Sequence, residues 1–275
     1  MKSATSILSA LLGTAMTFAL VSAAQATATR TYVSNAGDDT NTATNCPHSA
    51  PCKTFSAAYS VTQSGGEIIA LDLGAYGPLT ITTPLSISAL AGAIITVQTG
   101  TVGITVTAGA TNVVILRNFQ ISGAAGSSNT KGIQVNSGRL VPQYSTLKFL
   151  TTALVVNNSK ADVNDNDIIG NATGISTTGT GGDAQNFPAT GATTEVRISG
   201  GRILDNTTAF VMNDPGLRPS PATDNRITIF LLNQGGGITP VMAGNTTVIS
   251  GTGSSCTSQC LQAAQYSSQV GSNQN

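Results

Sequence analysis

The chain contains no tryptophan and one histidine, and Lys, Arg, Asp and Glu together make up only 9% of its residues. Twelve basic residues balance twelve acidic ones, so net charge does not favour nucleic acid or an anionic membrane surface as a partner. A catalytic triad needs a positioned histidine, and His48 is the single one; the sequence G-x-S-x-G does not occur. These absences argue against nucleic-acid binding and serine-type hydrolysis.

Residues 1–26 have the pattern of a secretory signal peptide. Lys2 precedes a mostly apolar run from Ile7 to Val21, and Ala24-Gln25-Ala26 supplies the small residues of a cleavage site. No later apolar run is long enough to span a membrane as a helix. The sequence therefore predicts a secreted or periplasmic bacterial protein, without membrane insertion once residues 1–26 are removed.

The four cysteines form two close pairs, Cys46/Cys52 and Cys256/Cys260. Four cysteines allow three connectivities, and in an oxidising compartment local pairing is the simplest. The alternative is a zinc site of four thiolates, but neither pair has the C-x₂-C spacing typical of such sites. We expect two local disulfides, Cys46–Cys52 and Cys256–Cys260.

From residue 67 to about residue 250 the chain consists of short β segments separated by Gly, Asn and Ser. No segment has a sustained helical period, so helices should be rare. Strands are predicted at Glu67–Leu71, Leu79–Ile81, Ile94–Val97, Ile104–Thr107, Val113–Leu116 and Arg226–Leu231. This pattern is typical of a sandwich, a barrel or a solenoid, and internal repeats distinguish between them.

Internal repeats favour the solenoid. Similar strands begin at Gly132, Ala153, Gly174 and Ala209, and the first two intervals are equal. The last interval is longer by the length of segment 179–192, which we interpret as an inserted loop. The alignment pairs Val163 with Ile198, Ile168 with Ile203, Ile169 with Leu204, Ile175 with Phe210, Asn118 with Asn166 and Ile121 with Ile169. A constant period of about 21 residues fits one coil of a β-solenoid, in which stacked coils share a core.

A different kind of segment precedes the repeats. Within residues 51–67 the sequence predicts a helix with Thr54 as its N-cap, an apolar face, and Gly65-Gly66 as its end. The apolar face consists of Phe55, Ala58, Tyr59 and Thr62. Such a helix would cover the open end of the first coil. The expected organisation is a signal peptide at 1–26, an N-terminal strand, disulfide loop and capping helix at 27–66, a parallel β-helix at 67–250, and a C-terminal cap or tail at 251–275.

Several segments resemble a known family in the expected order: TYVSNAGDDTN (31–41), APCKTFSAAYSV (50–61), SGGEIIALDLGAYGPLTI (64–81), GNATGI (170–175) and DNTTAF (205–210). In these segments the chain resembles bacterial secreted right-handed parallel β-helix proteins with the pectin-lyase-like fold. The resemblance covers nearly all of residues 27–275 and implies an all-β, right-handed parallel β-helix. That family includes lyases, hydrolases, isomerases and adhesins, so the resemblance does not imply one activity.

One activity that the resemblance implies is a calcium-dependent lyase acting on an acidic polysaccharide. It would require carboxylates from adjacent coils on one outer face, beside an Arg or Lys that abstracts a proton. Asp162, Asp183, Asp205 and Asp224 recur at intervals close to the coil period. The candidate calcium ligands are Asp162, Asp165, Asp167, Asp205 and Asp224, and the candidate bases are Arg197, Arg202, Arg218 and Arg226.

Other features favour a protein that binds without catalysis. Hydrolases of this fold usually carry a Gly-His-Gly element, whereas His48 lies in the predicted disulfide loop and should be exposed. Aromatic residues that could stack on sugar rings are restricted to Tyr76, Tyr144, Phe149 and Phe187. The sequence predicts a secreted β-helix without a recognisable catalytic apparatus, which binds a polysaccharide or cell-surface component or has a structural role. No cofactor is expected apart from calcium in the lyase alternative.

The segment VNDND (163–167) is the strongest local resemblance to a calcium site. Read as an EF-hand loop it fails, because Asp167 stands at the glycine position and Thr173 at the position of the bidentate glutamate. We expect instead a corner of the coil, with Asn166 in the left-handed backbone region. Val163, Ile168 and Ile169 should then face the core.

Overall fold

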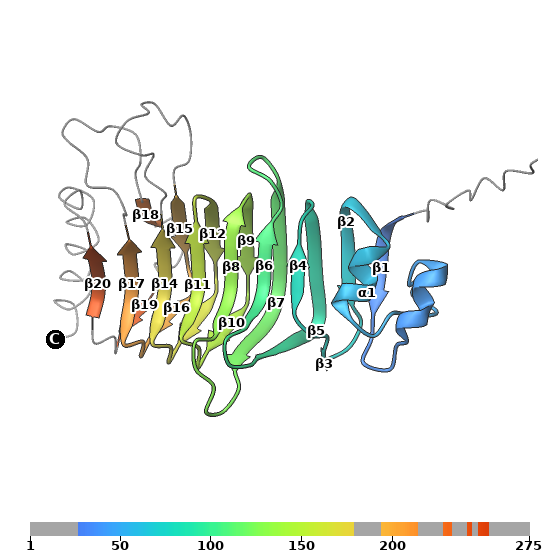
Figure 1. Ribbon diagram of the computed structural model, residues 1–275, viewed down its shortest axis with the longest axis horizontal. Helices are drawn as coiled ribbons and strands as arrows, with labels where there is room; N and C mark the ends of the chain where they lie inside the picture. Colours follow the sequence, from blue (N-terminus) through green and yellow to red (C-terminus); the bar gives the residue numbers. More distant parts are fainter. Residues whose placement is uncertain (1–26, 179–193, 214–227, 233–240, 244–246, 253–275) are drawn as a thin grey trace, which may run out of the picture.

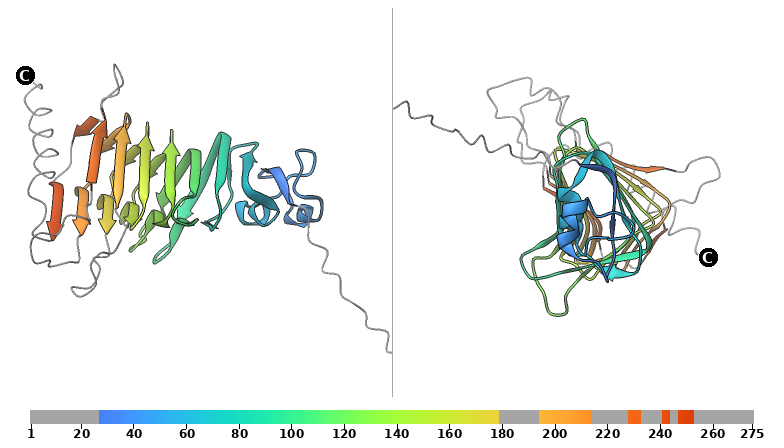
Figure 2. Two further views of the ribbon diagram at one scale, coloured as in Figure 1. Left: turned by 90° about the horizontal axis from the view of Figure 1, so that it is seen from above. Right: turned by 90° about the vertical axis from the view of Figure 1, so that its right-hand side faces the viewer.

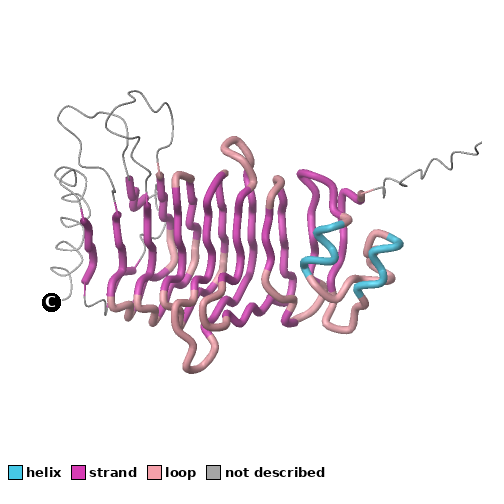
Figure 3. Tube along the Cα trace, viewed as in Figure 1, coloured by secondary structure: helices cyan, strands magenta, loops and turns pink. Residues whose placement is uncertain are grey.

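The computed structural model describes residues 27–178, 194–213, 228–232, 241–243 and 247–252 (Figure 1). Within these ranges the chain is mostly β-strand, and all neighbouring strands are parallel. The helices of this part are α1 (Phe55–Ser60) and the 3-10 helix η1 (Asp39–Thr44), both at the N-terminal end (Figure 3). The predicted all-β class is confirmed. The predicted signal peptide and inserted loop lie outside the described residues.

Thirteen strands form a first sheet and seven form a second sheet. The first sheet begins with β1 (Ala28–Val33), β2 (Thr62–Ala70), β3 (Gly74–Ala75), β5 (Leu85–Val97) and β7 (Val113–Gly123). Beyond β7 it divides into two branches. The long branch contains β9 (Arg139–Gln143), β12 (Lys160–Asn164), β15 (Glu195–Ser199) and β18 (Thr228–Leu232). The short branch contains β10 (Thr146–Lys148), β13 (Asp167–Ile169), β16 (Arg202–Leu204) and β19 (Val241–Ala243). The second sheet consists of β4 (Leu79–Ile81), β6 (Val102–Thr107), β8 (Lys131–Ser137), β11 (Thr152–Asn157), β14 (Thr173–Thr178), β17 (Thr208–Asn213) and β20 (Thr247–Thr252), in this spatial order.

The long branch, the short branch and the second sheet are three faces around a common core. Strand β7 belongs to two of these faces, because Val113–Arg117 pairs with β9 whereas Gln120–Ser122 pairs with β10. Between these segments Asn118 adopts a left-handed φ of 63°. The end view is roughly triangular (Figure 2), and the side view shows the strands stacked along the long axis (Figure 1). From β9 onward, the chain therefore passes through the long branch, the short branch and the second sheet in turn.

The predicted period is confirmed in the middle of the stack. Thr152 pairs with Lys131 on one side and with Thr173 on the other, at equal intervals along the chain. The hydrogen bond from the N–H of Thr130 to the hydroxyl of Thr151 joins residues with the same sequence separation, 21. Thr173 pairs with Thr208, so the longer interval falls where the inserted loop was predicted. All four apolar pairs predicted between residues 160–175 and 195–210 are direct partners, so the hydrophobic pattern alone was sufficient to predict this register.

The predicted constant period is wrong near the N-terminal end of the stack. Leu79 pairs with Ile104 and Ile104 with Ile133, so both of these intervals are longer than those in the middle of the stack. Only the strands must stay in register, and the corners between them can therefore differ in length. The alignment of the earlier copy was also displaced by one position, because Ile121 and Ile168 both pair with Leu147. Ile121 therefore corresponds to Ile168, not to Ile169.

The core consists of columns of apolar side chains that run along the stack. One column on the second sheet contains Ile104, Ile133, Leu154, Ile175 and Phe210, each of which is almost completely buried. Burying each such side chain contributes about 1.5–3 kcal/mol. Val163 and Ile168 face the core as predicted, but Ile169 is only partly buried. In the short strand β13 the central side chain points inward, so Ile169 must point outward.

The glycine at the start of two of the four predicted repeats has a steric cause. A Cβ atom added to Gly132 would lie 2.5 Å from the carbonyl oxygen of Ala153 in the next repeat. A Cβ atom added to Gly174 would lie 2.6 Å from the carbonyl oxygen of Ala209. Both distances are well below van der Waals contact, so the close approach of the two backbones requires glycine at these positions.

Helix α1 lies at the N-terminal end of the stack, as the sequence predicts. The side chain of Thr54 caps it by accepting a hydrogen bond from the N–H of Ala57 at 3.1 Å. The helix ends at Ser60, however, and not at Gly65-Gly66. The hydroxyl of Thr62 donates to the carbonyl oxygen of Ala58 at 2.7 Å, and β2 begins at this residue. Pairing with β1 thus replaces the last predicted turn of the helix, and both glycines belong to β2.

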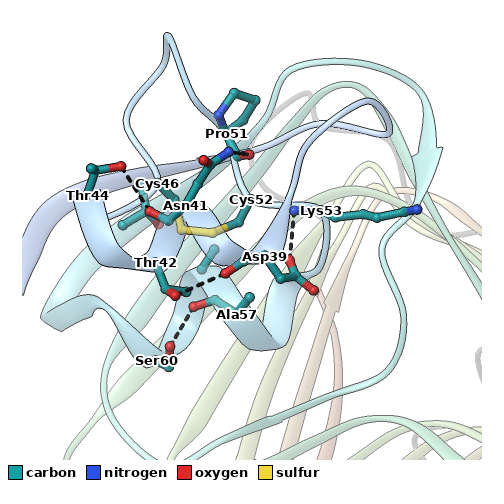
Figure 4. Close-up of a disulfide and its surroundings, with 12 residues drawn as sticks. Asp39, Asn41, Thr42, Thr44, Cys46, Pro51, Cys52, Lys53, Ala57 and Ser60 are labelled. Atoms are coloured by element: carbon teal, nitrogen blue, oxygen red, sulfur yellow. Dashed lines mark hydrogen bonds between the residues drawn. A yellow bond between two sulfur atoms is a disulfide. The ribbon is translucent and has the colours of Figure 1, made fainter.

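The predicted Cys46–Cys52 disulfide is confirmed, and both cysteines are fully buried beside α1 (Figure 4). Asp39 holds the following segment in place, because its carboxylate accepts hydrogen bonds from the N–H groups of Lys53 (2.8 Å) and Thr54 (2.9 Å). The disulfide loop is thereby connected directly to the N-cap of α1. Cys256 and Cys260 lie outside the described residues.

Candidate functional site

Two of the predicted calcium ligands form ion pairs. On the short branch Asp167 lies beside Arg202 of the next repeat, whose Nε donates to the carboxylate at 2.8 Å. On the long branch Asp162 accepts a hydrogen bond from Nε of Arg139 in the preceding repeat. These partners neutralise both carboxylates.

The other two described aspartates lie at corners of the stack. Asp165 (φ 52°) connects the long and short branches, and Asp205 (φ 54°) follows the short branch. Asp162, by contrast, lies within strand β12, so Asp162 and Asp205 do not form the column predicted from their spacing. Asp and Asn tolerate left-handed backbone angles better than most residues, which accounts for both corner aspartates.

The described residues contain no group of three or more His, Cys, Asp or Glu side chains that could hold a metal ion. Asp162, Asp165, Asp167 and Asp205 are therefore not gathered into a calcium site. Asp183 and Asp224 lie outside the described residues.

Among the candidate bases, Arg202 is poorly suited to remove a proton. Its hydrogen bond to Asp167, together with the negative charge of that carboxylate, raises the pKa of Arg202 above its usual value. A general base requires a pKa shift in the opposite direction. Arg197 lies exposed on the long branch, whereas Arg218 and Arg226 lie outside the described residues. His48 is exposed, as predicted, and its ring contacts Tyr32 edge-on with 5.2 Å between centroids.

The second asparagine of VNDND, Asn166, stabilises the stacking of the repeats. Asn166 is buried, and the left-handed residue is its neighbour Asp165, contrary to the prediction. The side chain of Asn166 accepts from the N–H of Ser145 at 2.9 Å and donates to the carbonyl oxygen of Pro142 at 2.8 Å. It thus links two successive repeats from inside the corner. At the next corner Asn171 and Asn206 make an equivalent buried ladder.

The outer face of the second sheet carries polar side chains in register. One column begins with Val102 and Lys131 and continues through the half-buried residues Thr152, Thr173 and Thr208. A parallel column contains Thr80, Thr105, Gln134, Val155, Ser176 and Val211. The two columns repeat along the axis with the strand spacing of about 4.8 Å. Their polar members present hydroxyl and amide groups, and one ammonium group, to the surroundings, whereas Val102, Val155 and Val211 interrupt the columns with apolar side chains.

Side-chain hydrogen bonds order part of this face. Nζ of Lys131 donates to Gln134 at 3.1 Å, and the Gln134 amide donates to Asn136 at 3.0 Å. Asn157 of the next strand donates to the same oxygen of Asn136 at 3.0 Å. The polar groups are therefore held in a fixed arrangement before any ligand arrives, which reduces the entropy cost of binding.

A pocket lies at the α1 end of this face. Its volume is about 260 Å³, and α1 and the first strands of the second sheet line it with Ser56, Tyr59, Pro78, Leu79, Thr80, Val102 and Thr105. Thr80, Thr105 and Val102 are also the first residues of the two columns, so the pocket and the columns are continuous. No sequence pattern indicated this pocket, because it depends on how α1 packs against β4.

Tyr59 forms one wall of the pocket, and four hydrogen-bonding groups surround its hydroxyl. Its hydroxyl accepts from the N–H groups of Thr82 (2.8 Å) and Thr83 (3.1 Å) and bonds to both threonine hydroxyls. Burial acts to raise the pKa of Tyr59, but these hydrogen bonds outweigh it and lower the pKa below its usual value. The ring is thus a rigid surface beside the polar columns.

The four aromatic residues considered for sugar stacking have different environments. Tyr76 is fully buried and donates to the backbone carbonyl of Asp72 at 2.6 Å. Phe187 lies outside the described residues. Tyr144 and Phe149, by contrast, each expose 66% of their surface.

The chain matches no protein-family model, and searches of curated proteins and of solved structures find no significant match. Among the described residues, no helix has the length and apolar character required to cross a membrane.

Proposed function

We propose that the chain is an exported right-handed parallel β-helix of the pectin-lyase-like type. Parallel pairing throughout, three faces around one core, and the recurring order of strands support this architecture. Right-handedness is the expected hand, because crossovers between parallel strands are right-handed in about 98% of cases. The signal-peptide pattern of residues 1–26 supports export to the periplasm or the medium.

We further propose that this protein binds an extended polysaccharide, or a cell-surface component with such a chain, along the outer face of the second sheet. The observation that carries the proposal is the pocket beside Tyr59, which shares Thr80, Val102 and Thr105 with two in-register, mostly polar columns. A glycan chain end would occupy the pocket, and the following sugars would lie along the columns.

The periodicity of the face suits a periodic ligand. A typical hydrogen bond contributes only about 1 kcal/mol net, so one sugar would bind weakly. Successive strands offer similar groups at intervals of about 4.8 Å, and seven strands span about 29 Å from first to last. Affinity should therefore rise with glycan length until the chain spans the sheet, and then become constant.

The proposal is tested with the chain lacking residues 1–26 and a panel of soluble polysaccharides, followed by a length series of the best ligand. We expect Kd to fall at each added sugar and then to level off. Ser56→Arg fills the pocket and should weaken binding at least tenfold. Ser60→Arg is the matched control, because Ser60 is exposed on the same helix but does not line the pocket. Absence of binding across the panel, or equal effects of the two substitutions, would contradict the proposal.

The same panel distinguishes binding from the lyase alternative. A lyase generates an unsaturated product that absorbs in the ultraviolet, so acidic polysaccharides should be incubated with and without calcium. Calcium-dependent absorbance would contradict the binding proposal and support the lyase. The candidate residues Asp224, Arg218 and Arg226 would then be substituted first.

A further inference from the structure

Two large aromatic residues occupy a backbone conformation that disfavours them. Tyr144 and Phe149 have φ angles of 52° and 56°, and both rings are largely exposed. A bulky residue with φ in this range is an outlier, since its Cβ crowds the backbone. Such strain persists only where the surrounding structure enforces it, and it is concentrated at functional sites.

The fold requires the left-handed conformation at these corners but not the aromatic rings. In the register of the strands, Tyr144 corresponds to Asn118, Asp165 and Gly200 in other repeats, with φ angles of 63°, 52° and 66°. Phe149 corresponds to Gly170 and Asp205, with φ angles of 64° and 54°. These equivalent corners thus use Asn, Asp or Gly, which adopt this conformation at lower cost. Folding alone does not account for two aromatic residues in one repeat.

The two rings flank strand β10, whose outward side chains are polar. Thr146 and Lys148 point outward while Leu147 is buried. Beside Thr146 lies the Asp167–Arg202 ion pair. Five steps of about 3.3 Å along the chain separate the aromatic residues, so their backbones lie at most about 17 Å apart. On this surface the polar strand β10 therefore lies between the two aromatic residues.

The ring of Phe149 is held in place. A Cβ atom on Gly170 would lie 3.2 Å from the ring, so the ring packs directly over this glycine of the next repeat. Nζ of Lys148 lies 5.8 Å from the ring centroid, within the range of a cation–π contact. The Phe149 ring thus contacts both neighbours, stays largely exposed, and has a charged hydrogen-bond donor close by.

We propose that Tyr144, Thr146, Lys148 and Phe149 form a second carbohydrate subsite, which lies on the short branch and takes pyranose rings of a glycan. A pyranose ring has a C–H face, which packs on an aromatic ring, and a rim of hydroxyls, which Thr146 and Lys148 can bind. A protein partner is a poorer fit, because a stable protein interface buries about 800 Å² per partner around an apolar centre. The strands of the short branch are very short, and the surface between the two rings is mostly polar. The subsite rests on the proposed function for its class of ligand but not for its location.

The decisive experiment replaces both aromatic residues by asparagine, the residue that occupies the equivalent corner at position 118. In Tyr144→Asn/Phe149→Asn the corners keep a residue suited to φ above zero, so the melting temperature should stay equal or rise. We expect Kd for the best ligand among cello-, chito- and manno-oligosaccharides, measured by calorimetry, to increase at least tenfold. The control Tyr144→Phe keeps the ring and should retain affinity within about twofold. In the natural chain, saturation-transfer NMR should detect contact between the sugar and the aromatic protons.

Each outcome separates the subsite from the second-sheet face. If Tyr144→Asn/Phe149→Asn binds oligosaccharides as tightly as the natural chain while Ser56→Arg does not, the subsite is refuted and the proposed function stands. If the double variant alone loses affinity, the subsite is supported and the second-sheet location is refuted. A lower melting temperature with unchanged affinity would show that the rings stabilise the fold, and it would overturn the inference. Absence of saturation transfer from the protein to all three oligosaccharide classes would overturn it as well.

Discussion

Removal of one buried asparagine should destabilise this fold by several times the effect of removing a half-buried one on an outer face. Asn171 lies inside the corner between the short branch and the second sheet and is almost completely buried. Its Oδ1 accepts from the N–H of Leu150 at 3.0 Å, and its Nδ2 donates to the carbonyl oxygen of Leu147 at 3.1 Å. Nδ2 also donates to Oδ1 of Asn206 at 2.9 Å. In Asn171→Ala, two buried backbone groups lose these partners.

The expected cost follows from these two orphaned groups. Each buried polar group left without a partner costs about 1–3 kcal/mol, so Asn171→Ala should lower the free energy of unfolding by about 2–6 kcal/mol. Oδ1 of Asn206 keeps the N–H of residue 171 as a donor, at 3.0 Å, and contributes little to the loss. The same reasoning applies to Asn166 at the preceding corner.

Asn136→Ala is the matched control. Asn136 accepts two side-chain hydrogen bonds on the outer face of the second sheet, where water can replace it. Its loss should cost less than about 1 kcal/mol. Guanidinium denaturation followed by circular dichroism would measure both variants, with the m-value checked for constancy. Hydrogen exchange at the amide of Leu150 should accelerate in Asn171→Ala alone. Equal losses of stability in the two variants would refute the account of the corner ladder.

Three further effects are expected. Gly174→Ala brings a Cβ against a carbonyl oxygen of the next repeat and should lower the melting temperature by several degrees in thermal unfolding. Replacing both Cys46 and Cys52 by Ser should cost about 2 kcal/mol, because the short loop between them is no longer closed in the unfolded chain; exchange in α1 should increase first. Burial acts to raise the pKa of Asp72, but hydrogen bonds, the first from Tyr76, outweigh it and lower the pKa. The stabilisation is therefore present above about pH 4 and is lost as pH falls through the lower folded pKa, so Asp72→Asn should flatten the acid limb of the stability–pH curve.

The middle of the stack was predictable because the core imposes a repeating pattern. Ile168 pairs with Ile203, and Ile175 pairs with Phe210, at the separation that the sequence alignment predicted. Parallel strands in register place equivalent residues above one another, so most inward positions stay apolar from repeat to repeat, although Thr177 stands at the buried position of Val156. This constraint produces a periodic hydrophobic pattern that can be recognised in the sequence.

The corners were less predictable because two neighbouring residues can each adopt left-handed angles. In VNDND the choice between Asp165 and Asn166 depends on which side chain becomes buried. The inward side chain must both donate and accept, as Asn166 does towards Pro142 and Ser145. An amide can do both, whereas an ionised carboxylate only accepts. The burial that decides between them is known only once the repeats are stacked.

The candidate sites depend on tertiary structure to a greater degree. The pocket beside Tyr59 depends on how α1 packs against β4, which no sequence pattern indicated. Tyr144 and Phe149 were visible in the sequence as aromatic residues, but their backbone angles and the residues at equivalent corners are what mark them as a subsite. Neither property has a local sequence pattern.

In-register stacking also explains why the predicted column of carboxylates is missing from the described part. Equivalent positions in neighbouring parallel strands lie about 4.8 Å apart, so like charges in one column would repel along the whole stack. Both strand-borne aspartates of this part have an arginine as their partner in the next repeat. Asp167 pairs with Arg202, and the strand position of Asp162 pairs with that of Arg197. The carboxylates of Asp162 and Asp167 are thereby balanced, and the same repulsion favours mostly uncharged side chains on the second sheet.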